Sequence, residues 1–529
     1  MKRRLPIGIQ DFAKIREGGF VYVDKTACIH QLINGSDTAC FLSRPRRFGK
    51  SLLCSTLEAV FEGQRELFGE ITGQPALAIN SLEWEWKKHP VICIDLNAGA
   101  YFNGTAALHS AFSRELKREA GNQSVVLDDD DCINQFAQLI EKSCEKACEK
   151  TVVIIDEYDK PLLETITDNA VHVAIRNELK GFYGILKSYD RYLRLVFLTG
   201  VSKFAHVSIF SDLNHLFDIT LDPQYPDICG ITQEEMEQSF KPEIEEILKD
   251  TGKNRESYLG DLKRFYDGYR FTENPLKVYN PFGMLTHFAK KGKFLPYWYE
   301  TGTPTFLVNL IIMQKLNILD LNNLHVEYES FRKYDIENTE AAPLLYQTGY
   351  LTIIDYDEQA EIFTLDYPND EVRSSFSRSL LEQYFQSTSK AQQNLSSGLI
   401  LALHSGDVDR AMNAVKTFLA LVPYDIIKEK ENYYQTAIHL IFTMLGFNCR
   451  SEVRIAAGRI DTLVETKDYV YCFEFKLDGS AEEALAQIDK KDYLLPWTGS
   501  GKTLFKVGVN FDHEKRNISE WKQDLQSDS

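Results

Sequence analysis

An apolar run that leads through a cationic loop into a helical pattern constrains this chain most. The run spans residues 39–43, the loop reads RPRRFGKS over 44–51, and apolar side chains at helical spacing follow. A strand, a loop ending in Gly-Lys-Ser and a helix form the context of a phosphate-binding loop. Backbone N–H groups of the loop and of the helix N-terminus would face the phosphates. Lys50 would reach the β- and γ-phosphates, and Ser51 would ligate Mg²⁺.

The first half of this loop departs from the standard pattern. Arg44 stands where a glycine is usual, Pro45 stiffens the loop, and two further arginines add positive charge. Gly-Lys-Ser alone is a weak signal, because composition alone produces it often in chains of this length. A basic surface turn is therefore the alternative interpretation. The nucleotide-binding candidates in this segment are Arg46, Arg47, Phe48, Gly49, Lys50, Ser51 and Leu52.

Two later apolar runs end in residues that suit the same chemistry. Residues 151–161 read TVVIIDEYDKP, a buried β run that ends in two acids. At the carboxyl end of a strand, Asp156 can hold Mg²⁺ and Glu157 can polarise the attacking water; a plain strand exit is the alternative. A third run ends at Thr199, either a sensor of the γ-phosphate or an ordinary strand cap. The three segments together predict ATP binding.

These segments resemble a bacterial AAA-ATPase-like family whose loop reads RPRRFGKS and whose acidic motif reads IIDEYDKP. LPIGIQDF near the start, YVDKT at 22–26 and LTGVSKF at 198–204 fit the same family. The resemblance covers roughly residues 1–225 and implies an AAA+-type ATP module in which the missing glycine is a family trait. Such modules often act as rings in which a neighbour supplies an arginine finger, so a homo-oligomer is one expectation. The candidates for that finger are Arg191, Arg194 and Lys203, none of them favoured.

Apolar runs alternate with helical patterns through residues 1–240. This alternation predicts an α/β fold, a P-loop NTPase of the AAA+ type, with a parallel sheet covered on both faces. Residues 241–395 are expected to form a mostly helical middle region with two short β pieces, and a polar stretch at 387–398 is the best linker candidate. Residues 396–529 would form a third domain. The expected strands of the first domain are Ala39–Ser43, Val91–Leu96, Thr151–Ile155, Leu195–Leu198 and Phe217–Leu221.

The C-terminal part carries a second set of polar residues. Residues 431–445 show an apolar stripe at helical spacing, and Glu431 lies on that stripe. Three β-like segments follow, the second with Asp461 in GRID and the third with Glu474 and Lys476 in YVYCFEFK. Residues two apart in a strand share a face, so Glu474 and Lys476 point the same way. A cross-strand ion pair and a helix-dipole role for Glu431 are the plain alternatives.

Asp461 followed after twelve residues by Glu-x-Lys resembles the signature of the PD-(D/E)XK nuclease superfamily. The resemblance is sharpest to the branch with GRID, EFK and a downstream AL-x-QI-x-x-K-x-Y, here at 484–493, and it covers about residues 415–520. It implies a restriction-endonuclease-like α/β core with the order α-β-β-β-α-β. Asp461, Glu474 and Glu431 would hold Mg²⁺ or Mn²⁺, Lys476 would orient the attacking water, and Gln487 would contact the scissile strand or position Lys476. This branch commonly occurs fused to the ATPase-like family.

Charge limits how such a protein could touch nucleic acid. The chain has 59 Lys+Arg and 77 Asp+Glu, a formal net charge of −18, so no general affinity for polyanions is expected. Contact with DNA, favoured over RNA, should depend on metal and on a small cationic area. The apolar runs are too short to span a bilayer, the start lacks a signal-peptide pattern, and the cysteines form no CxxC pair. A cytoplasmic protein with free thiols is therefore expected.

The sequence thus predicts an ATP-binding and ATP-hydrolysing protein with a metal-dependent nuclease domain, in which ATP regulates cleavage. A role in defence or in processing mobile elements rests on analogy alone. The rival hypothesis is a signalling ATPase whose nuclease-like domain binds nucleic acid or a protein partner without cutting.

Overall fold

A computed structural model of the chain describes residues 3–35, 37–166, 168–203, 216–302, 305–314, 316–332, 341–384, 389–421, 431–455 and 458–526. Its contacts divide the chain into two compact units. The first comprises Met1–Trp298 and Leu324–Asn369, and the second comprises Tyr299–Asn323 and Asp370–Ser529. The three sequence-based domains, 1–240, 241–395 and 396–529, stay a prediction, and the residues of the middle one contribute to both units.

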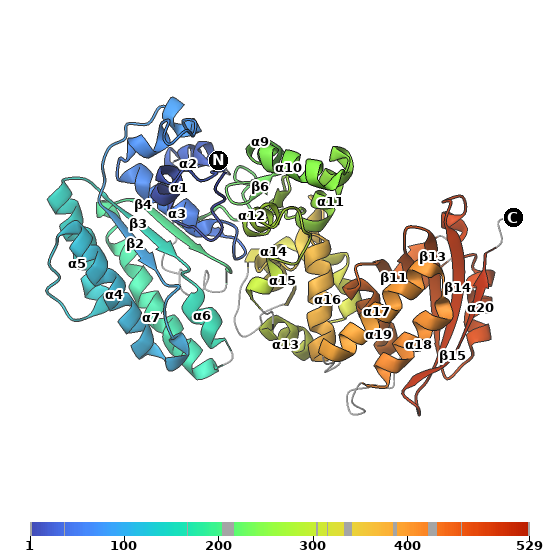
Figure 1. Ribbon diagram of the computed structural model, residues 1–529. Coiled ribbons are helices and arrows are strands. Elements are labelled where there is room, and N and C mark those ends of the chain that lie inside the picture. Colours follow the sequence, from blue (N-terminus) through green and yellow to red (C-terminus); the bar gives the residue numbers. More distant parts are fainter. Residues whose placement is uncertain are drawn as a thin grey trace. The chain divides into compact units, whose positions relative to one another are not determined.

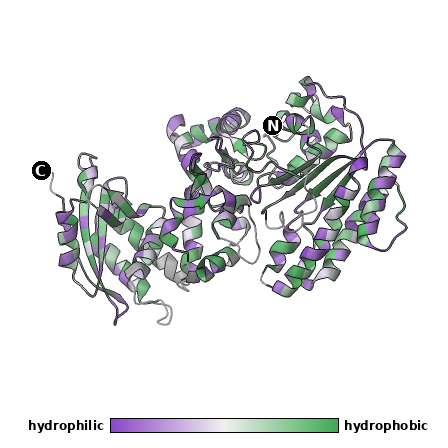
Figure 2. Cartoon of the chain, turned by 180° about the vertical axis from the view of Figure 1, so that it is seen from behind, coloured by the Kyte–Doolittle hydropathy of each residue, from purple (hydrophilic) through white to green (hydrophobic). Residues whose placement is uncertain are grey.

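The first unit contains a five-stranded sheet in the order β2-β3-β4-β1-β5, and every pair in it is parallel. The central strands read as continuous apolar runs because side chains on both of their faces are buried. Figure 2 shows these strands as largely hydrophobic. The α/β class and the parallel sheet are confirmed. The strands are β1 (Ala39–Ser43), β2 (Val91–Asp95), β3 (Thr151–Asp156), β4 (Leu193–Gly200) and β5 (Phe217–Asp218).

Helices cover both faces of this sheet (Figure 1). On one face α4, α5 and α7 pack together, and the ring of Phe182 stacks 3.7 Å from Phe112 and 4.5 Å from Phe136. On the other face α3 packs against β3. The aspartate run before α5 ends at Asp131, whose side chain caps that helix. The helices are α1 (Phe12–Glu17), α2 (Thr26–Ile33), α3 (Lys50–Phe61), α4 (Thr105–Gln123), α5 (Cys132–Ala147), α6 (Lys160–Thr165) and α7 (Asn169–Ser188).

The rest of the first unit is mostly helical, as the sequence predicts for the middle region. It adds a small antiparallel sheet in the order β8-β10-β9 and a two-stranded pair, β6 with β7. Within the described residues, no helix is long and apolar enough to cross a membrane. These elements are β6 (Ile231–Thr232), α9 (Gln233–Ser239), α10 (Lys241–Thr251), α11 (Arg255–Tyr266), β7 (Val278–Tyr279), α12 (Pro281–Ala289), β8 (Leu324–Glu327), α14 (Tyr328–Arg332), α15 (Ala341–Gln347), β9 (Thr352–Asp357) and β10 (Ile362–Asp366).

The second unit joins helices to a five-stranded sheet in the order β11-β12-β13-β14-β15. Only β13 and β14 pair in parallel. The run α19-β11-β12-β13-α20-β14 has the expected order, and β15 extends the sheet beyond the predicted core. The elements are α13 (Thr305–Met313), α16 (Asp370–Tyr384), α17 (Ser389–Ser405), α18 (Val408–Leu419), α19 (Glu431–Met444), β11 (Asn448–Ile455), β12 (Gly458–Glu465), β13 (Tyr469–Leu477), α20 (Ala481–Lys490), β14 (Thr503–Asp512) and β15 (Asn517–Leu525).

Two sequence-based expectations for the second unit are wrong. The linker expected at 387–398 lies largely in α17, because Leu395 and Leu399 are buried and give that helix a packing face. The sequence also predicts a helix over Ala481–Leu495 after the third β-like segment, but this helix ends at Lys490, because Asp492 takes a left-handed conformation with φ at 46°.

Candidate functional site

The cationic loop joins the end of β1 to the start of α3. Its last residue, Gly49, is the N-cap of α3 and has a φ of 95°, a left-handed conformation that glycine adopts readily. A Cβ placed on Gly49 would meet no atom within 4 Å, so open space adjoins the loop where the helix begins. The loop therefore offers backbone N–H groups and a helix N-terminus to an anion.

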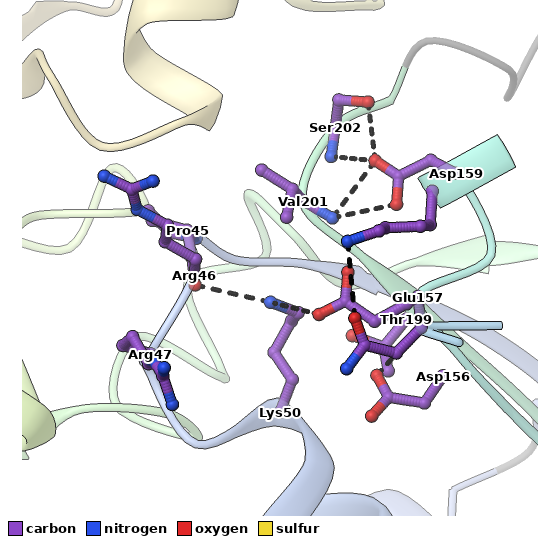
Figure 3. A network of polar contacts seen from close by, with 12 residues as sticks. Pro45, Arg46, Arg47, Lys50, Asp156, Glu157, Asp159, Thr199, Val201 and Ser202 are labelled. Carbon is purple, nitrogen blue, oxygen red and sulfur yellow. Dashed lines mark hydrogen bonds and ion pairs between the residues drawn. The ribbon is translucent and has the colours of Figure 1, made fainter. Parts of the chain in front are cut away.

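Lys50 lies where the two predicted motifs meet. Strand β4 separates β1 from β3, and because the three are parallel their carboxyl ends reach the same edge of the sheet. The buried ammonium of Lys50 donates to the Pro45 carbonyl oxygen at 3.4 Å and lies 3.6 Å from Oε1 of Glu157 (Figure 3). Burial lowers the pKa of Lys50, but the carboxylates of Glu157 and Asp156 outweigh that effect and raise it. The ammonium therefore stays charged.

Ser51 and Asp156 supply oxygen atoms beside this ammonium. The Ser51 hydroxyl forms a hydrogen bond with the Asp156 carboxyl group. Burial, followed by the neighbouring charge of Glu157, raises the pKa of Asp156 to about 6. The hydroxyl and carboxylate oxygens are ligands that suit Mg²⁺, and the neighbouring ammonium of the buried lysine suits the phosphates of a nucleotide. The residues present thus fit the magnesium–ATP complex that the sequence predicts.

Protonation of Asp156 should weaken the binding of magnesium–ATP below pH 6. Mg²⁺ binds the carboxylate form, and with a pKa of about 6 that form is in the minority at pH 5. We expect the affinity for magnesium–ATP to be about tenfold lower at pH 5 than at pH 7.5 in a fluorescence titration. The affinity for ATP without Mg²⁺ should change much less between these two pH values, and Asp156→Asn should abolish the pH dependence of magnesium–ATP binding. An affinity of the wild-type protein that stays constant over this range would contradict the role of Asp156.

Arg44, which replaces the usual glycine, is buried and binds backbone carbonyl groups, so its role is structural. Its guanidinium donates to the carbonyl oxygens of Ser43 and Thr220, both at 2.9 Å, and of Tyr225 at 3.1 Å. It also lies 4.5 Å from the ring centre of Phe271. The arginine therefore fastens the start of the loop to the segment that follows β5.

Arg44→Gly would restore the standard loop pattern, yet we expect it to destabilise the protein. The change removes three hydrogen bonds from the charged guanidinium and leaves the buried carbonyl oxygens that accepted them without this donor. The free energy of unfolding should therefore fall by about 3 kcal/mol. Urea unfolding measures this change. The matched control is Arg47→Gly, which removes an exposed arginine and should cost less than about 1 kcal/mol. Equal stability of Arg44→Gly and the wild-type protein would disprove the structural role of Arg44.

The other two loop arginines are held by aromatic side chains. The Arg46 carbonyl accepts from Nε1 of Trp298 at 3.0 Å, and the Arg46 guanidinium lies 5.2 Å from the same ring and 3.4 Å from the Tyr350 hydroxyl. Arg47 has a φ of 66° and lies 5.0 Å from the ring centre of Phe282. Both arginines lie in the loop as predicted, and their guanidinium groups stack on rings of the middle region.

An apolar cavity of about 90 Å³ adjoins Gly49. Phe48, Gly49 and Leu52 line it from the loop and α3, while Tyr22 and Ile228 line it from other segments. The flat aromatic face of a nucleoside base suits walls of this kind. Sequence reasoning gave no role to Tyr22 or Ile228; the only signal was that Tyr22 begins the YVDKT motif.

Thr199 and Asp159 connect the strand ends at this edge. The buried Thr199 hydroxyl donates to the Leu42 carbonyl oxygen at 2.8 Å, which ties β4 to β1. The buried Asp159 carboxylate accepts from the N–H groups of Val201 at 3.1 Å and Ser202 at 2.7 Å (Figure 3). Burial, then the charge of Glu157, raises the pKa of Asp159 to about 6. Asp159 was missed although it stands in the acidic motif, because no spacing rule predicts its partners.

Each candidate for an arginine finger has a partner elsewhere. Arg191 and Arg194 lie at the start of β4, the opposite edge of the parallel sheet from Lys50. Arg194 donates to the Ile33 carbonyl oxygen at 3.1 Å, and Arg191 stacks on Tyr192. Lys203 is buried and pairs with Asp218 at 2.5 Å. Within a single chain, Arg191 and Arg194 are therefore remote from the phosphate loop, and the charge of Lys203 is offset by Asp218.

The second set of predicted residues gathers on β12 and β13. Thr462 pairs with Phe473, and this antiparallel register continues to place Asp461 opposite Glu474 on one face of the sheet. The N–H of Phe475 donates to Oδ2 of Asp461 at 2.9 Å, and Glu474 is only 2% exposed. Two carboxylates therefore lie side by side in a largely buried position.

Lys476 and Gln487 complete this group. The Lys476 ammonium donates to Oε1 of Gln487 at 2.9 Å and lies 3.4 Å from Oε1 of Glu474. The amide nitrogen of Gln487 donates to Glu474, and it lies 3.4 Å from the Tyr493 hydroxyl. Gln487 projects from α20, which begins with a capping box. The structure thus brings together the four residues that the resemblance implies.

Helix α19 adds a contact that sequence reasoning missed. Nε2 of Gln435, a buried side chain, donates to the backbone carbonyl oxygen of Asp461 at 2.8 Å. The available signal was its position four residues after Glu431, on the same face of the helix. The Glu431 side chain itself lies outside the described residues, so its metal-binding role stays a prediction.

The carboxylate pair determines which metal this group suits. Within the described part of the chain, no three His, Cys, Asp or Glu side chains gather into a metal site. Mg²⁺ commonly binds through one or two carboxylates and keeps several waters. Asp461 and Glu474 therefore fit Mg²⁺ or Mn²⁺ better than a metal that needs a closed protein cage.

Comparisons with known proteins agree with both groups of residues. A family described as "Predicted AAA-ATPase" matches residues 6–210, and one described as "PD-(D/E)XK nuclease superfamily" matches residues 429–521. A protein of Azotobacter chroococcum mcd 1, described as "Uncharacterized protein in vnfD 5'region", is 33% identical over 528 residues, which cover 98% of each chain. The matches confirm both resemblances and their order along the chain.

Proposed function

Because the chain belongs to the family of AAA-ATPase-like proteins that end in a PD-(D/E)XK nuclease superfamily domain, we propose that it is an ATP-regulated nuclease. It binds and hydrolyses ATP in the first unit, and it cleaves nucleic acid, DNA in preference to RNA, in the second. The observation that carries this proposal is the presence of two assembled polar sites in one chain, one around Lys50 and one around Glu474.

At the first site each residue has a separate task. Lys50 neutralises the β- and γ-phosphates, Ser51 and Asp156 hold Mg²⁺, and Glu157 orients the attacking water. Glu157 is paired with Lys50, so a bound γ-phosphate competes with it for the ammonium and releases the carboxylate to work on water. The apolar cavity beside Gly49 receives the base.

At the second site Asp461 and Glu474 hold Mg²⁺ or Mn²⁺. A metal held there would supply an activated water and would stabilise negative charge on the phosphate in the transition state. Lys476 orients the nucleophile, and Gln487 fixes both Lys476 and Glu474. The chain carries a net charge of −18, so binding of the phosphate backbone depends on the metal and on a few local cations such as Lys491.

A cleavage assay tests the proposal. The purified full chain is incubated with plasmid DNA or with RNA in Mg²⁺ or Mn²⁺, with and without ATP, while ATP turnover is followed in parallel. Metal-dependent cleavage that changes on addition of ATP supports it. The rival signalling ATPase predicts ATP turnover and nucleic-acid binding without cleavage by the wild-type protein, with binding unchanged in Glu474→Ala.

The homo-oligomer belongs to the same proposal. Arg191 and Arg194 lie at the opposite end of the parallel sheet from Lys50 of their own chain, so as arginine fingers they would serve the ATP site of a second copy. Measurement of the molecular mass with and without ATP tests this part.

A further inference from the structure

Trp298 fixes the backbone of the phosphate loop. It is fully buried, and its indole N–H donates to the Arg46 carbonyl oxygen at 3.0 Å while the Arg46 guanidinium lies over its ring. A Cβ on Gly349 would lie 2.8 Å from Cβ of Pro45 and 3.3 Å from Cζ2 of Trp298, so ring, loop and Gly349 are closely packed. Residues 45 and 46 therefore cannot move without displacing the indole.

The nucleotide acts on the same stretch of backbone. Lys50 donates to the carbonyl oxygen of Pro45, the residue next to Arg46. A triphosphate that attracts the ammonium competes with this carbonyl, so the Pro45–Arg46 backbone loses one of its contacts when ATP binds. The presence or absence of bound ATP thereby alters the hydrogen bonding of the backbone segment that Trp298 also contacts.

The chain passes from the first unit to the second between Trp298 and Tyr299. Tyr299 is attached firmly on its own side of this boundary. Its N–H donates to Oε1 of Glu371 at 3.2 Å, and its hydroxyl donates to Oγ of Ser379 at 2.7 Å. Both acceptors are buried residues of α16. One peptide bond and the two hydrogen bonds of Tyr299 therefore connect Trp298 along the chain to α16.

Within the second unit, α16 leads to the metal-binding carboxylates. It packs along α19, and Gln435 of α19 holds the backbone carbonyl of Asp461 at 2.8 Å. Asp461 lies opposite Glu474. Each link thus lies inside one unit, except for the peptide bond that joins Trp298 to Tyr299.

We propose that Trp298 is a positioning residue for the phosphate loop and that Trp298 and Tyr299 together transmit the nucleotide state to the nuclease site. This inference rests on the proposed function, since it assigns the residues through which ATP regulates cleavage. It requires the Trp298–Arg46 contact to have two states. Bound nucleotide shifts the equilibrium between them, and the shift changes the position of Asp461.

Three conservative variants test the proposal in the full chain. Trp298→Phe keeps a ring but loses the N–H donor, and Tyr299→Phe loses the bond to Ser379. The matched control is Tyr297→Phe, one residue before the boundary, which loses a hydroxyl that donates to the Lys293 carbonyl oxygen at 3.0 Å in the first unit. Each protein is assayed for plasmid cleavage in Mg²⁺ with and without ATP, and for kcat and KM of ATP turnover.

We expect ATP to change the cleavage rate of the wild-type protein and of Tyr297→Phe at least about fivefold, and that of both other variants less than about twofold. Cleavage without ATP should be unchanged in all four. Trp298→Phe should also raise the KM for ATP about threefold with little change in kcat, whereas Tyr299→Phe should turn over ATP normally. This split distinguishes transmission from a general loss of folding.

Each other outcome overturns part of the account. A wild-type response in Trp298→Phe and Tyr299→Phe overturns the inference and leaves the proposed function standing. Loss of the response in Tyr297→Phe as well assigns the effect to loosening of the whole segment and also overturns it. A wild-type cleavage rate that ignores ATP removes the regulatory part of the proposed function itself, and the inference falls with it.

Discussion

Glu474→Gln should reduce metal-dependent cleavage at least about a thousandfold, a loss of roughly 4 kcal/mol of transition-state stabilisation. The buried Glu474 carboxylate faces Asp461, and an amide cannot offset the charge of a metal held between them. The substitution also replaces the carboxylate that both Lys476 and Gln487 contact with a neutral amide. Single-turnover cleavage of end-labelled DNA in Mg²⁺ measures the loss, and chelation of the metal should abolish cleavage by the wild-type protein.

The same sheet offers a matched control for this experiment. Glu465 of β12 is also a carboxylate, but it pairs with Arg450 and with Lys502, the latter at 3.3 Å, outside the group around Glu474. Glu465→Gln should leave the cleavage rate within about twofold of wild type. If Glu474→Gln retained a tenth or more of the wild-type rate, the carboxylate pair would not be the metal site.

Glu157→Gln should slow ATP turnover about a hundredfold to a thousandfold while ATP still binds. Glu157 follows the last residue of β3, and its carboxylate lies 3.6 Å from the Lys50 ammonium. In this position the carboxylate can accept a proton from a water that attacks the γ-phosphate. Glutamine no longer pairs with the ammonium, so ATP should bind at least as tightly as in the wild-type protein. Turnover by a coupled assay and affinity by fluorescence titration separate the two effects.

The control for Glu157→Gln is Glu178→Gln, which removes an exposed carboxylate on α7 that contacts His109. This control should turn over ATP at the wild-type rate. Turnover by Glu157→Gln within tenfold of wild type would exclude Glu157 as the residue that activates water. If ATP binding rather than hydrolysis regulates the nuclease, Glu157→Gln with ATP should cleave DNA at the same rate as the wild-type protein with a non-hydrolysable analogue.

The parallel sheet could be predicted closely because its strands are buried on both faces. β1 and β3 read as uninterrupted apolar runs, and the expected boundaries agree with the observed ones to within a residue. β15 could not be predicted in this way, because it is an edge strand in which residues 522–524 are exposed and polar. The polar start of α17 misled for a related reason, since the buried leucines described on this helix, Leu395 and Leu399, come after it.

The site residues that were predicted share a local rule. Glu474 and Lys476 come together because residues two apart in a strand share a face, and Lys50 meets Glu157 because parallel strands end at one edge. Arg44, Asp159 and Gln435 were not assigned roles because their partners, among them Thr220, Val201 and Asp461, are remote in sequence and no periodicity indicates them. Burial of a charged or polar side chain is the property that identifies such residues, and burial can be read only from the fold.

The central claim is that one chain cleaves nucleic acid under control of its own ATP site. The most direct test is the rate of plasmid cleavage by the full chain in Mg²⁺, with and without ATP, beside Lys50→Ala. The account predicts metal-dependent cleavage whose rate changes at least about fivefold with ATP in the wild-type protein and does not change in Lys50→Ala. Wild-type protein that cuts neither DNA nor RNA, in Mg²⁺ or Mn²⁺ and with or without ATP, would contradict it.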